Sequence, residues 1–420
     1  MKLNNTKVLI PGLLMIFCSL VFPTSYIIIK ILLLGIVSLQ FILWVIREKK
    51  VFLDKELVLV VLFTVAISGL YIMLGAFRGE PGAYRVITVY LFWPLLYLGF
   101  FSVLIYEYAI HSVIKVFIYA LITITIYSYL YIGYELGLIP RLLYINFDLG
   151  QSIGFYDGYM EFSMYSVSSL LYLIPFCIAG LFVWDHEFYN KIRISKKLVV
   201  IFTILGIIVS VLSGRRALWL VIIFSFIVIF LLNIIVSNSS KLHNIRKLFV
   251  FSVFVVLISI ISIPLINNYI DLDFHSLINK FDFQAEYERS SQFKALIDGW
   301  KESPLFGNGY GAVASVIRSE ETPWAYELQY IDLLFKTGVI GFLVYGLVGI
   351  WVVKKTLNIA KRIKESRMVI LPMLTGVLAF LVANATNPYL LKFDYIWVLI
   401  FPIGIINHYL HRSFNSKYGG

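Results

Sequence analysis

Apolar runs recur from one end of this chain to the other, and short polar or charged segments separate them. Most runs approach the roughly 20 residues that a helix needs to cross a hydrocarbon core about 30 Å thick. An alternating barrel pattern is absent, so helices are the structures that satisfy the backbone in a bilayer. The predicted spans are residues 8–22, 26–46, 57–74, 88–105, 113–132, 167–184, 198–212, 217–236, 248–266, 333–353, 369–385 and 395–409.

This pattern predicts an all-α integral membrane protein, with about 12 transmembrane helices in a single polytopic domain over residues 1–420. The first span is the shortest, because Pro11 lies within it and Pro23 follows it. It is similar to a signal peptide, but no small-residue cleavage site follows. We therefore expect a retained helix.

Composition and charge agree with a membrane protein. Hydrophobic residues make up 60% of the chain, charged residues 14%, and the mean hydropathy is +0.87. The net charge of +11 would suggest a nucleic-acid partner in a soluble protein, but here the basic residues gather after the second, sixth, eighth and tenth spans. The positive-inside rule then makes those loops and both termini cytoplasmic, and no nucleic-acid partner is expected.

Two of the loops on the other, non-cytoplasmic side are long. They are residues 133–166 and residues 267–326, and the second lies between the ninth and tenth spans. Their Trp, Tyr, Phe and Gly content is not typical of disorder, so a functional role is indicated. The chemistry is therefore expected outside the cytoplasm. Cys18 and Cys177 both fall in apolar spans, so no disulfide framework is predicted.

Several arginines stand in outward loops, where the topology rule disfavours them. They are Arg78 and Arg85 in "RGEPGAYR", Arg141, Arg215 and Arg216 in "SGRRALWL", Arg289 and Arg318. A charge held at bilayer depth costs about 2.5 to 3.5 kcal/mol, and bidentate bonds to a lipid diphosphate would offset that cost. The alternative is that these side chains extend to lipid phosphates as passive anchors.

The stretch "SPLFGNGYG" follows a predicted helix over about residues 290–301. Gly307 and Gly309 permit positive φ and close backbone approach, so they could cradle an anion or a sugar. Ordinary loop geometry explains them as well, and the spacing fits neither nucleotide-binding glycine motif. Trp300, Tyr310 and Trp324 could stack on sugar faces, although interfacial aromatic belts account for them equally.

Glu327 opens the amphipathic turn that leads into the tenth span. A carboxylate there, partly desolvated and facing arginines, could act as a general base on a sugar hydroxyl. Charge complementarity with a helix N-terminus is the alternative. Asp271, Asp273 and His275 have a spacing that could grip a divalent ion, but no further ligands cluster nearby, so no metal site is predicted.

The order of these features resembles the O-antigen polymerase and O-antigen ligase superfamily. "SGRRA" stands before a span, "RSSQFKALIDGW" opens a large outward loop, and "SPLFGNGYG" and "ELQYIDLLFKTGVIGFLVYG" follow. The resemblance is specific over residues 212–349 and architectural elsewhere. It implies a membrane glycosyltransferase fold of the C class (GT-C-like), which uses undecaprenyl-diphosphate-linked glycans without a metal, nucleotide or other cofactor.

The resemblance also implies roles for individual residues. Arg216, with Arg215 as its alternate, matches the family arginine of the short turn, Arg289 the arginine that opens the loop helix, and Gly307 and Gly309 the glycine motif. Ligases of the family typically carry His-Asn where this chain has Glu327 and Leu328. That departure favours a polymerase over a ligase and leaves the identity of the base open.

The reaction expected from this resemblance is polymerisation of lipid-linked repeat units into O-antigen or a related surface polysaccharide. Glu327, Arg216 and Arg289 are the predicted catalytic residues, and Arg215, Arg78, Arg85, Gly307, Gly309 and Tyr310 are predicted to bind substrate. The expected partners are the lipid-linked donor and acceptor and membrane lipids, with a chain-length regulator and a flippase as further candidates. An O-antigen ligase is the second interpretation, and a lipid-linked oligosaccharide flippase or transporter is the third.

Overall fold

The computed structural model describes residues 6–48, 53–102, 107–147, 149–156, 159–237 and 287–418. Within these ranges seven helices are long and apolar enough to cross a membrane, or eight if the pair His186–Ile192 and Lys196–Leu212, bent by 86°, forms one span. Three shorter apolar helices, at Ile10–Val21, Ile27–Gln40 and Thr88–Phe101, match further predicted spans. The chain is thus a multi-pass, mostly helical membrane protein. The predicted span 248–266 lies outside the described residues, and the count of twelve stays a prediction.

The described chain divides into two compact units, and each is described by itself. The first unit comprises Met1–Gly35, Tyr108–Phe283 and Ala360–Ala383, and the second comprises Ile36–Glu107, Gln284–Ile359 and Asn384–Gly420. The helix α2 (Ile27–Glu48) begins in the first and ends in the second. The prediction of one polytopic domain stays a prediction.

The core of the first unit is α6 (Leu170–Val183), which is apolar on all sides and buried along most of its length. It packs against α8 (Lys196–Leu212), α9 (Arg216–Ser237) and α14 (Arg367–Ala383). Gly376 of α14 faces the ring of Tyr172, so these two helices approach closely. The remaining elements are α1 (Thr6–Val21), α5 (Glu107–Glu135), η2 (Arg141–Leu143), η3 (Tyr165–Ser169), α7 (His186–Ile192) and η5 (Lys364–Ser366).

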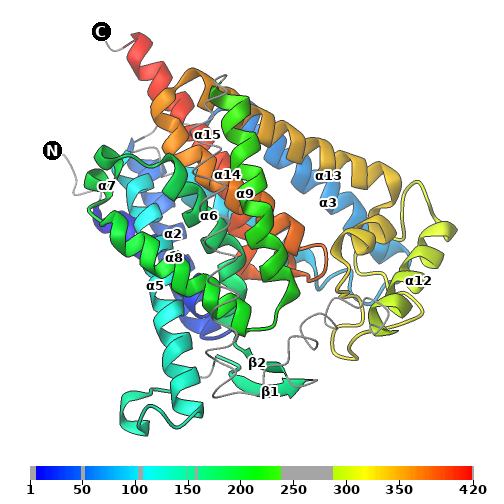
Figure 1. Ribbon diagram of the computed structural model, residues 1–420. Coiled ribbons are helices and arrows are strands. Elements are labelled where there is room, and N and C mark those ends of the chain that lie inside the picture. The colour runs from blue at the N-terminus through cyan, green and yellow to red at the C-terminus, as the bar shows by residue number, and fades with distance from the viewer. Residues whose placement is uncertain are drawn as a thin grey trace. The chain divides into compact units, whose positions relative to one another are not determined.

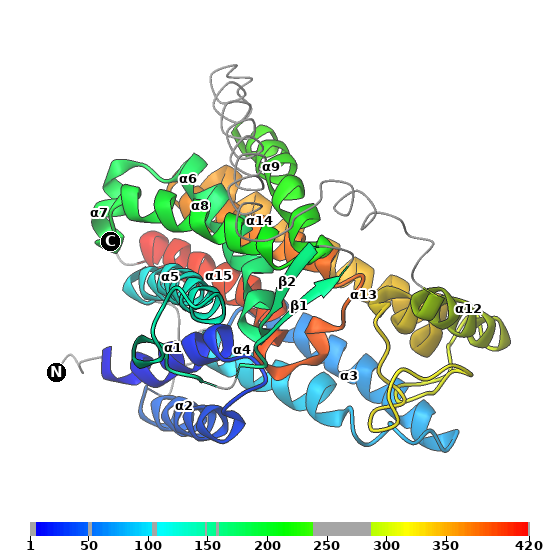
Figure 2. The same ribbon diagram turned by 60° about the horizontal axis from the view of Figure 1, so that its bottom comes forward.

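A short hairpin lies in the predicted outward loop 133–166 of this unit. Strands β1 (Ser152–Tyr156) and β2 (Tyr159–Ser163) pair antiparallel, with Ser152 opposite Ser163 and Tyr156 opposite Tyr159 (Figure 2). The apolar pattern of the chain predicts helices and loops alone, and the hairpin differs from that prediction. Its signal was Asp157-Gly158 between two aromatic-rich stretches, a dipeptide typical of tight hairpin turns.

In the second unit α3 (Lys55–Phe77) and α13 (Gln329–Arg362) run side by side and antiparallel (Figure 1). Glu56 pairs with Lys355, and the hydroxyls of Ser68 and Tyr345 lie 2.8 Å apart. The helix α4 (Trp93–Ser102), preceded by a π-helical turn η1 (Thr88–Phe92), packs on α15 (Phe393–Tyr418). The helix α12 (Tyr287–Glu302) and the turn η6 (Tyr389–Leu391) complete the described part of this unit.

Candidate functional site

The glycine-rich stretch of the second unit passes through a break in α13. Gly338 has φ 63° and ψ −172°, a conformation essentially restricted to glycine, and it divides α13 into a short first part and a long second part. Backbone N–H groups of Asn308 and Gly309 donate to the carbonyls of Phe335 and Lys336, at 3.0 and 2.8 Å. These bonds satisfy carbonyls that end the first part of the helix.

The same stretch also caps the second part of α13. Val339 and Ile340 donate their N–H groups to the carbonyls of Pro304 and Leu305, at 2.9 and 3.1 Å. Each broken end therefore finds backbone partners in one loop, which removes the cost of buried, unpaired N–H and C=O groups. The loop and the helix break therefore form one hydrogen-bonded structural element.

Close backbone packing explains the glycines of this stretch. A Cβ on Gly307 would overlap Lys336 and Gly338, and a Cβ on Gly309 would overlap Gly75 at the end of α3. Both glycines have positive φ, 69° and 91°. Their N–H groups are bonded to the carbonyls of Ser303 and Lys336 rather than directed at a ligand. The predicted substrate-binding role of Gly307 and Gly309 stays a prediction, and the geometry gives them a structural role.

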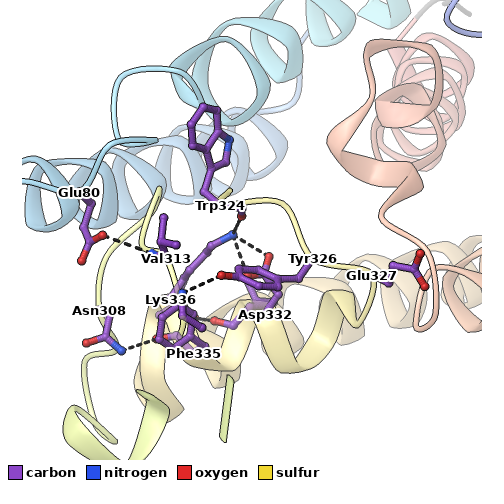
Figure 3. Close-up of polar contacts among 12 residues, drawn as sticks. Glu80, Asn308, Val313, Trp324, Tyr326, Glu327, Asp332, Phe335 and Lys336 are labelled. Atoms are coloured by element: carbon purple, nitrogen blue, oxygen red, sulfur yellow. Dashed lines mark hydrogen bonds and ion pairs between the residues drawn. The ribbon is translucent and has the colours of Figure 1, made fainter. Parts of the chain in front are cut away.

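Two charged residues of the turn after α3 hold the loop in place. Arg78 donates from Nη1 to the carbonyl of Gly307 and to Oδ1 of Asn308, at 3.0 and 2.9 Å. The N–H of Val313 donates to Oε2 of Glu80 at 3.3 Å (Figure 3). Burial raises the pKa of Glu80, while the Val313 N–H and the Arg78 guanidinium oppose that rise. Arg78 is thus a tie to the loop, and Arg85 of the same turn is exposed.

The side chain of Tyr310, at the end of this stretch, is buried. Its ring is 1% exposed and stacks on Tyr90 with centroids 3.9 Å apart, while Tyr71 packs edge-on. Burial raises the pKa of Tyr310 well above its ordinary value. Sugar stacking by Tyr310 stays a prediction, because the structure shows this ring engaged in packing.

Two arginines flank Glu327 at the entrance to α13. Arg289, in the first turn of α12, donates from Nε to Glu327 Oε2 at 2.6 Å. Arg318, on the segment between the loop and α13, places Nη2 2.9 Å from Glu327 Oε1. The side chains of Arg289, Glu327 and Arg318 are 32%, 17% and 45% exposed, so solvent reaches this arginine–glutamate cluster. Two cations and one anion leave it with an excess positive charge.

A small apolar core positions the arginine–glutamate cluster. Ala295 and Leu296 of α12 pack with Ala312, Ala314, Tyr326 and Phe335, and Leu328 and Ile331 cover them. Gly299 brings α12 against the ring of Phe335. The N–H of Glu327 donates to Oε1 of the buried Gln292 at 3.3 Å. The cluster therefore joins three segments that meet over one core.

A second ion pair lies inside the first part of α13. Lys336 Nζ is 2.7 Å from Asp332 Oδ2 and 2.7 Å from the carbonyl oxygen of Trp324, and it lies over the ring of Tyr326 (Figure 3). The two side chains are 3% and 1% exposed. Tyr326 accepts the N–H of Ala314 at 2.6 Å, and burial raises the pKa of Tyr326 to about 12. This buried pair therefore fixes the segment that leads to Glu327.

The arginines of the predicted short turn belong to the first unit. Arg215 donates to Ser168 Oγ at 2.7 Å and to the carbonyl of Met164 at 3.1 Å, so it ties the turn to the segment after β2. Arg216 begins α9 and is half-buried. Arg215 thus has a structural tie, and the phosphate-binding role of both residues stays a prediction.

The structure brings together Arg289 and Glu327, which the sequence analysis named separately. It adds Arg318 to them. The sequence predicts Arg318 only as an arginine in an outward loop, which is a feature that it shares with Arg289. Asp332 and Lys336 were missed, and their signal was an aspartate and a lysine four residues apart on a predicted helix. Among the described residues no group of three or more His, Cys, Asp and Glu forms a metal site. Asp271, Asp273 and His275 lie outside that part of the chain.

Comparison with known families agrees with these observations. A family model described as O-antigen ligase matches residues 201–346, a range that includes the Arg215–Arg216 turn, α12, the glycine-rich stretch and the break in α13. No curated protein matches the chain. Members of the matched family are membrane glycosyltransferase-like enzymes. Over residues 201–346 the chain is therefore similar to the O-antigen ligase and polymerase superfamily, whose members act in surface polysaccharide biosynthesis.

Proposed function

We propose that the protein polymerises undecaprenyl-diphosphate-linked repeat units into an O-antigen or related surface polysaccharide at the outer face of the cytoplasmic membrane. The observation that carries this proposal is the arginine–glutamate cluster, which lies within the matched region and combines a carboxylate with two guanidinium groups. A diphosphate leaving group needs cations, and a sugar hydroxyl needs an acceptor for its proton. One cluster offers both.

The proposed step is a displacement at an anomeric carbon. The hydroxyl oxygen of the acceptor sugar forms a bond to the anomeric carbon of the donor glycan, and the bond from that carbon to the diphosphate oxygen breaks. The electron pair leaves with undecaprenyl diphosphate, and the hydroxyl proton passes to Glu327. Because a diphosphate is already a good leaving group, the protein chiefly needs to stabilise its negative charge.

Glu327 is oriented for this role by its two arginines. Each carboxylate oxygen accepts from one guanidinium, and a carboxylate oxygen has lone pairs for a second donor such as a sugar hydroxyl. The guanidinium groups carry five N–H donors each, in a planar fork that matches phosphate oxygens. Each charge-assisted bond to the diphosphate would contribute about 1.5 to 3 kcal/mol. Arg85 of the same unit is proposed to add positive charge at the same substrate, and a catalytic role of Arg216 is proposed from the sequence resemblance alone.

A ligase, which transfers the finished glycan to lipid A core or another acceptor, is the second candidate. The matched family model carries the description O-antigen ligase, and the match itself does not distinguish a ligase from a polymerase. A ligase requires the same displacement and the same stabilisation of the leaving group, so the arginine–glutamate cluster suits it as well. The two reactions differ in the acceptor, and the products therefore distinguish them.

The experiment is deletion of the gene in its native host, followed by complementation with wild type, Arg216→Ala, Arg289→Ala and Glu327→Gln. Lys294→Ala on α12 and Glu321→Gln serve as matched controls, because both residues are exposed and lie near the cluster in the sequence. Surface glycan and lipid-linked glycan are resolved separately by gel, at matched membrane abundance of each variant.

Wild type and the two controls should restore a ladder of chain lengths, while the three site variants should leave single lipid-linked repeat units. If the deletion strain instead accumulates long lipid-linked chains that wild type only moves to an acceptor, the protein is a ligase. If repeat units in the deletion strain stay on the cytoplasmic side of the membrane, the protein is a transporter and the proposed reaction is wrong.

A further inference from the structure

The segment after α5 in the first unit is an exposed apolar loop. We call residues 136–147 the interface loop; it lies at the end of α5 in Figure 1. Leu142 is 93% exposed, and Leu138, Leu143 and Ile145 are each more than 60% exposed. Single exposed leucines are common on proteins, but a gathering of four on one short loop marks an interaction surface.

The interior of the interface loop is polar. The hydroxyl of Tyr127 donates to the carbonyl of Ile145 and accepts the N–H of Phe147, each at 3.1 Å. Gln151 donates from Nε2 to the hydroxyls of Tyr127 and Tyr144, at 2.7 and 3.0 Å. The backbone closes on itself as well, because Leu138 N–H donates to the carbonyl of Gly133 at 2.8 Å.

Stacking adds to these bonds, since the rings of Tyr134 and Tyr144 lie 4.6 Å apart and nearly parallel. The loop is therefore preorganised, with its Tyr144 hydroxyl and several backbone groups bonded inside and with Leu138, Leu142, Leu143 and Ile145 outside. That order is the reverse of a water-exposed loop, in which polar groups face solvent and apolar groups pack beneath. It is the order expected of a segment surrounded by an apolar medium.

The length of α5 indicates which medium this is. The helix has 29 residues, which at 1.5 Å per residue is about 43 Å, enough to cross the hydrocarbon core and reach the headgroup region. The interface loop begins where that helix ends. Tyr127, Tyr131 and Tyr134 lie on its last turns, and tyrosines concentrate at membrane interfaces.

Charge in the interface loop also suits a lipid surface. Arg141 is exposed among the apolar side chains, and residues 136–147 contain no acidic residue, although Glu135 precedes them and Asp148 follows them in the sequence. An arginine beside apolar side chains matches the boundary at which lipid phosphates meet acyl chains.

We propose that the interface loop inserts Leu142, Leu143 and Ile145 into the phospholipid bilayer at the C-terminal end of α5, with Arg141 bound to lipid phosphate. The loop then fixes the depth and tilt of α5 in the membrane. This inference rests on the loop and its helix and does not depend on the proposed reaction.

The test places an environment-sensitive fluorophore on the loop. In a chain with Cys18→Ala and Cys177→Ala, Leu142→Cys and Ile145→Cys are labelled separately and reconstituted in nanodiscs of phosphatidylcholine and phosphatidylglycerol. Lys301→Cys on α12 is the matched control, since Lys301 is also exposed. Quenching is measured with nitroxide-bearing lipids and with aqueous iodide.

Labels at positions 142 and 145 should be quenched several-fold more by the nitroxide lipids than the label at 301, and less by iodide. Iodide quenching equal to that at position 301 would show that the interface loop lies in water, and the proposal would fail. Shielding from both quenchers would overturn it too, because a protein or a second copy of the chain would then cover the loop. The two labelled positions guard against a local disturbance at either one.

Discussion

Two groups of paired charges in the second unit use the same chemistry in different surroundings. The Asp332–Lys336 pair is almost fully buried, and its ammonium is also bonded to the Trp324 carbonyl. The arginine–glutamate cluster has similar distances, 2.6 and 2.9 Å, but its side chains are 17% to 45% exposed. Distance alone therefore does not separate a structural ion pair from a candidate site.

The buried pair and the exposed cluster differ in what surrounds their cations. Lys336 has three donors, and the structure directs them at a carboxylate and a carbonyl inside the protein, beside an aromatic ring. The half-exposed guanidinium groups of Arg289 and Arg318 still meet solvent, which a diphosphate can displace. A buried pair cannot exchange a partner without a large desolvation cost, whereas an exposed cluster can. We infer that the first holds the fold and the second serves the substrate.

Breaking the buried pair should have the largest effect. Lys336→Met leaves the Asp332 carboxylate inside α13 without its cation, and such a loss costs about 3 to 5 kcal/mol of stability. The matched control is Lys301→Met, which removes an exposed lysine that is 2.8 Å from Asp298 and should change stability by less than about 1 kcal/mol. Thermal unfolding of detergent-purified protein, followed by size-exclusion fluorescence, measures both.

The double variant Asp332→Leu/Lys336→Met sharpens this result. Removing both charges leaves no unpaired ion, so part of the lost stability should return. Equal stability of Lys336→Met and Lys301→Met would contradict the assignment of the buried pair to the fold.

The break in α13 should be the next most sensitive feature. Gly338→Ala forces a residue with a Cβ into a glycine-only conformation and against the carbonyl oxygen of Leu305, and we expect a loss of about 3 kcal/mol. Gly346→Ala in the same helix is the control, because a Cβ there meets nothing within 4 Å. That change should be neutral or stabilising, since alanine favours helix. The same thermal measurement applies, and a stable Gly338→Ala variant would show that the loop does not need this geometry.

Some helices of this protein follow from the sequence to within a few residues, whereas α13 (Gln329–Arg362) ends nine residues beyond its predicted span. The predicted span 217–236 corresponds to α9 (Arg216–Ser237), and 57–74 corresponds to α3 (Lys55–Phe77). Apolar length is a local property, so it can be read directly. The break at Gly338 could not be read, because it depends on carbonyls of Pro304 and Leu305 more than 30 residues earlier in the chain. A glycine in an apolar run gives no indication of such a partner.

The candidate site was predictable by residue type but not by pairing. Arg289 was expected on a loop helix and Glu327 at the start of the next, yet only coordinates show that they are 2.6 Å apart. Arg318, like Arg289, was predicted as an arginine in an outward loop, but the sequence indicated no partner for it. For Gly307 and Gly309 the sequence left loop geometry and substrate binding open, and their backbone packing supports the former.

A smaller effect is expected at the rim of the arginine–glutamate cluster. Arg318→Ala removes one of the two guanidinium groups on Glu327, and the loss of one charge-assisted bond should lower polymerisation about tenfold while stability stays nearly unchanged. Combining it with Glu327→Gln should add little, because both changes remove the same interaction. Ladder formation at matched abundance is the readout. Fully additive losses of polymerisation would show that Arg318 and Glu327 act independently. A large loss of stability would show that the arginine–glutamate cluster holds the fold.

Glu80 is a partly buried carboxylate that accepts a hydrogen bond from Val313 of the glycine-rich stretch. It therefore tests whether a charge of intermediate burial serves the fold, like the Asp332–Lys336 pair, or the substrate. Burial raises its pKa above the ordinary 4.5, so the folded chain binds this proton more tightly than the unfolded chain. The contribution of Glu80 to stability is therefore present at low pH and is lost as pH rises through the raised value. Glu80→Gln keeps an acceptor for the Val313 N–H and removes the charge.

The stability of Glu80→Gln relative to wild type should accordingly increase between about pH 4 and pH 7, by less than about 1 kcal/mol because the side chain is partly exposed. Thermal unfolding at several pH values measures the difference. If the glutamine variant is instead the less stable protein at neutral pH, the Val313 N–H bond and the attraction of the Arg78 charge to the carboxylate outweigh its burial. Glu80 would then belong with the buried pair, as a charge that the fold itself requires.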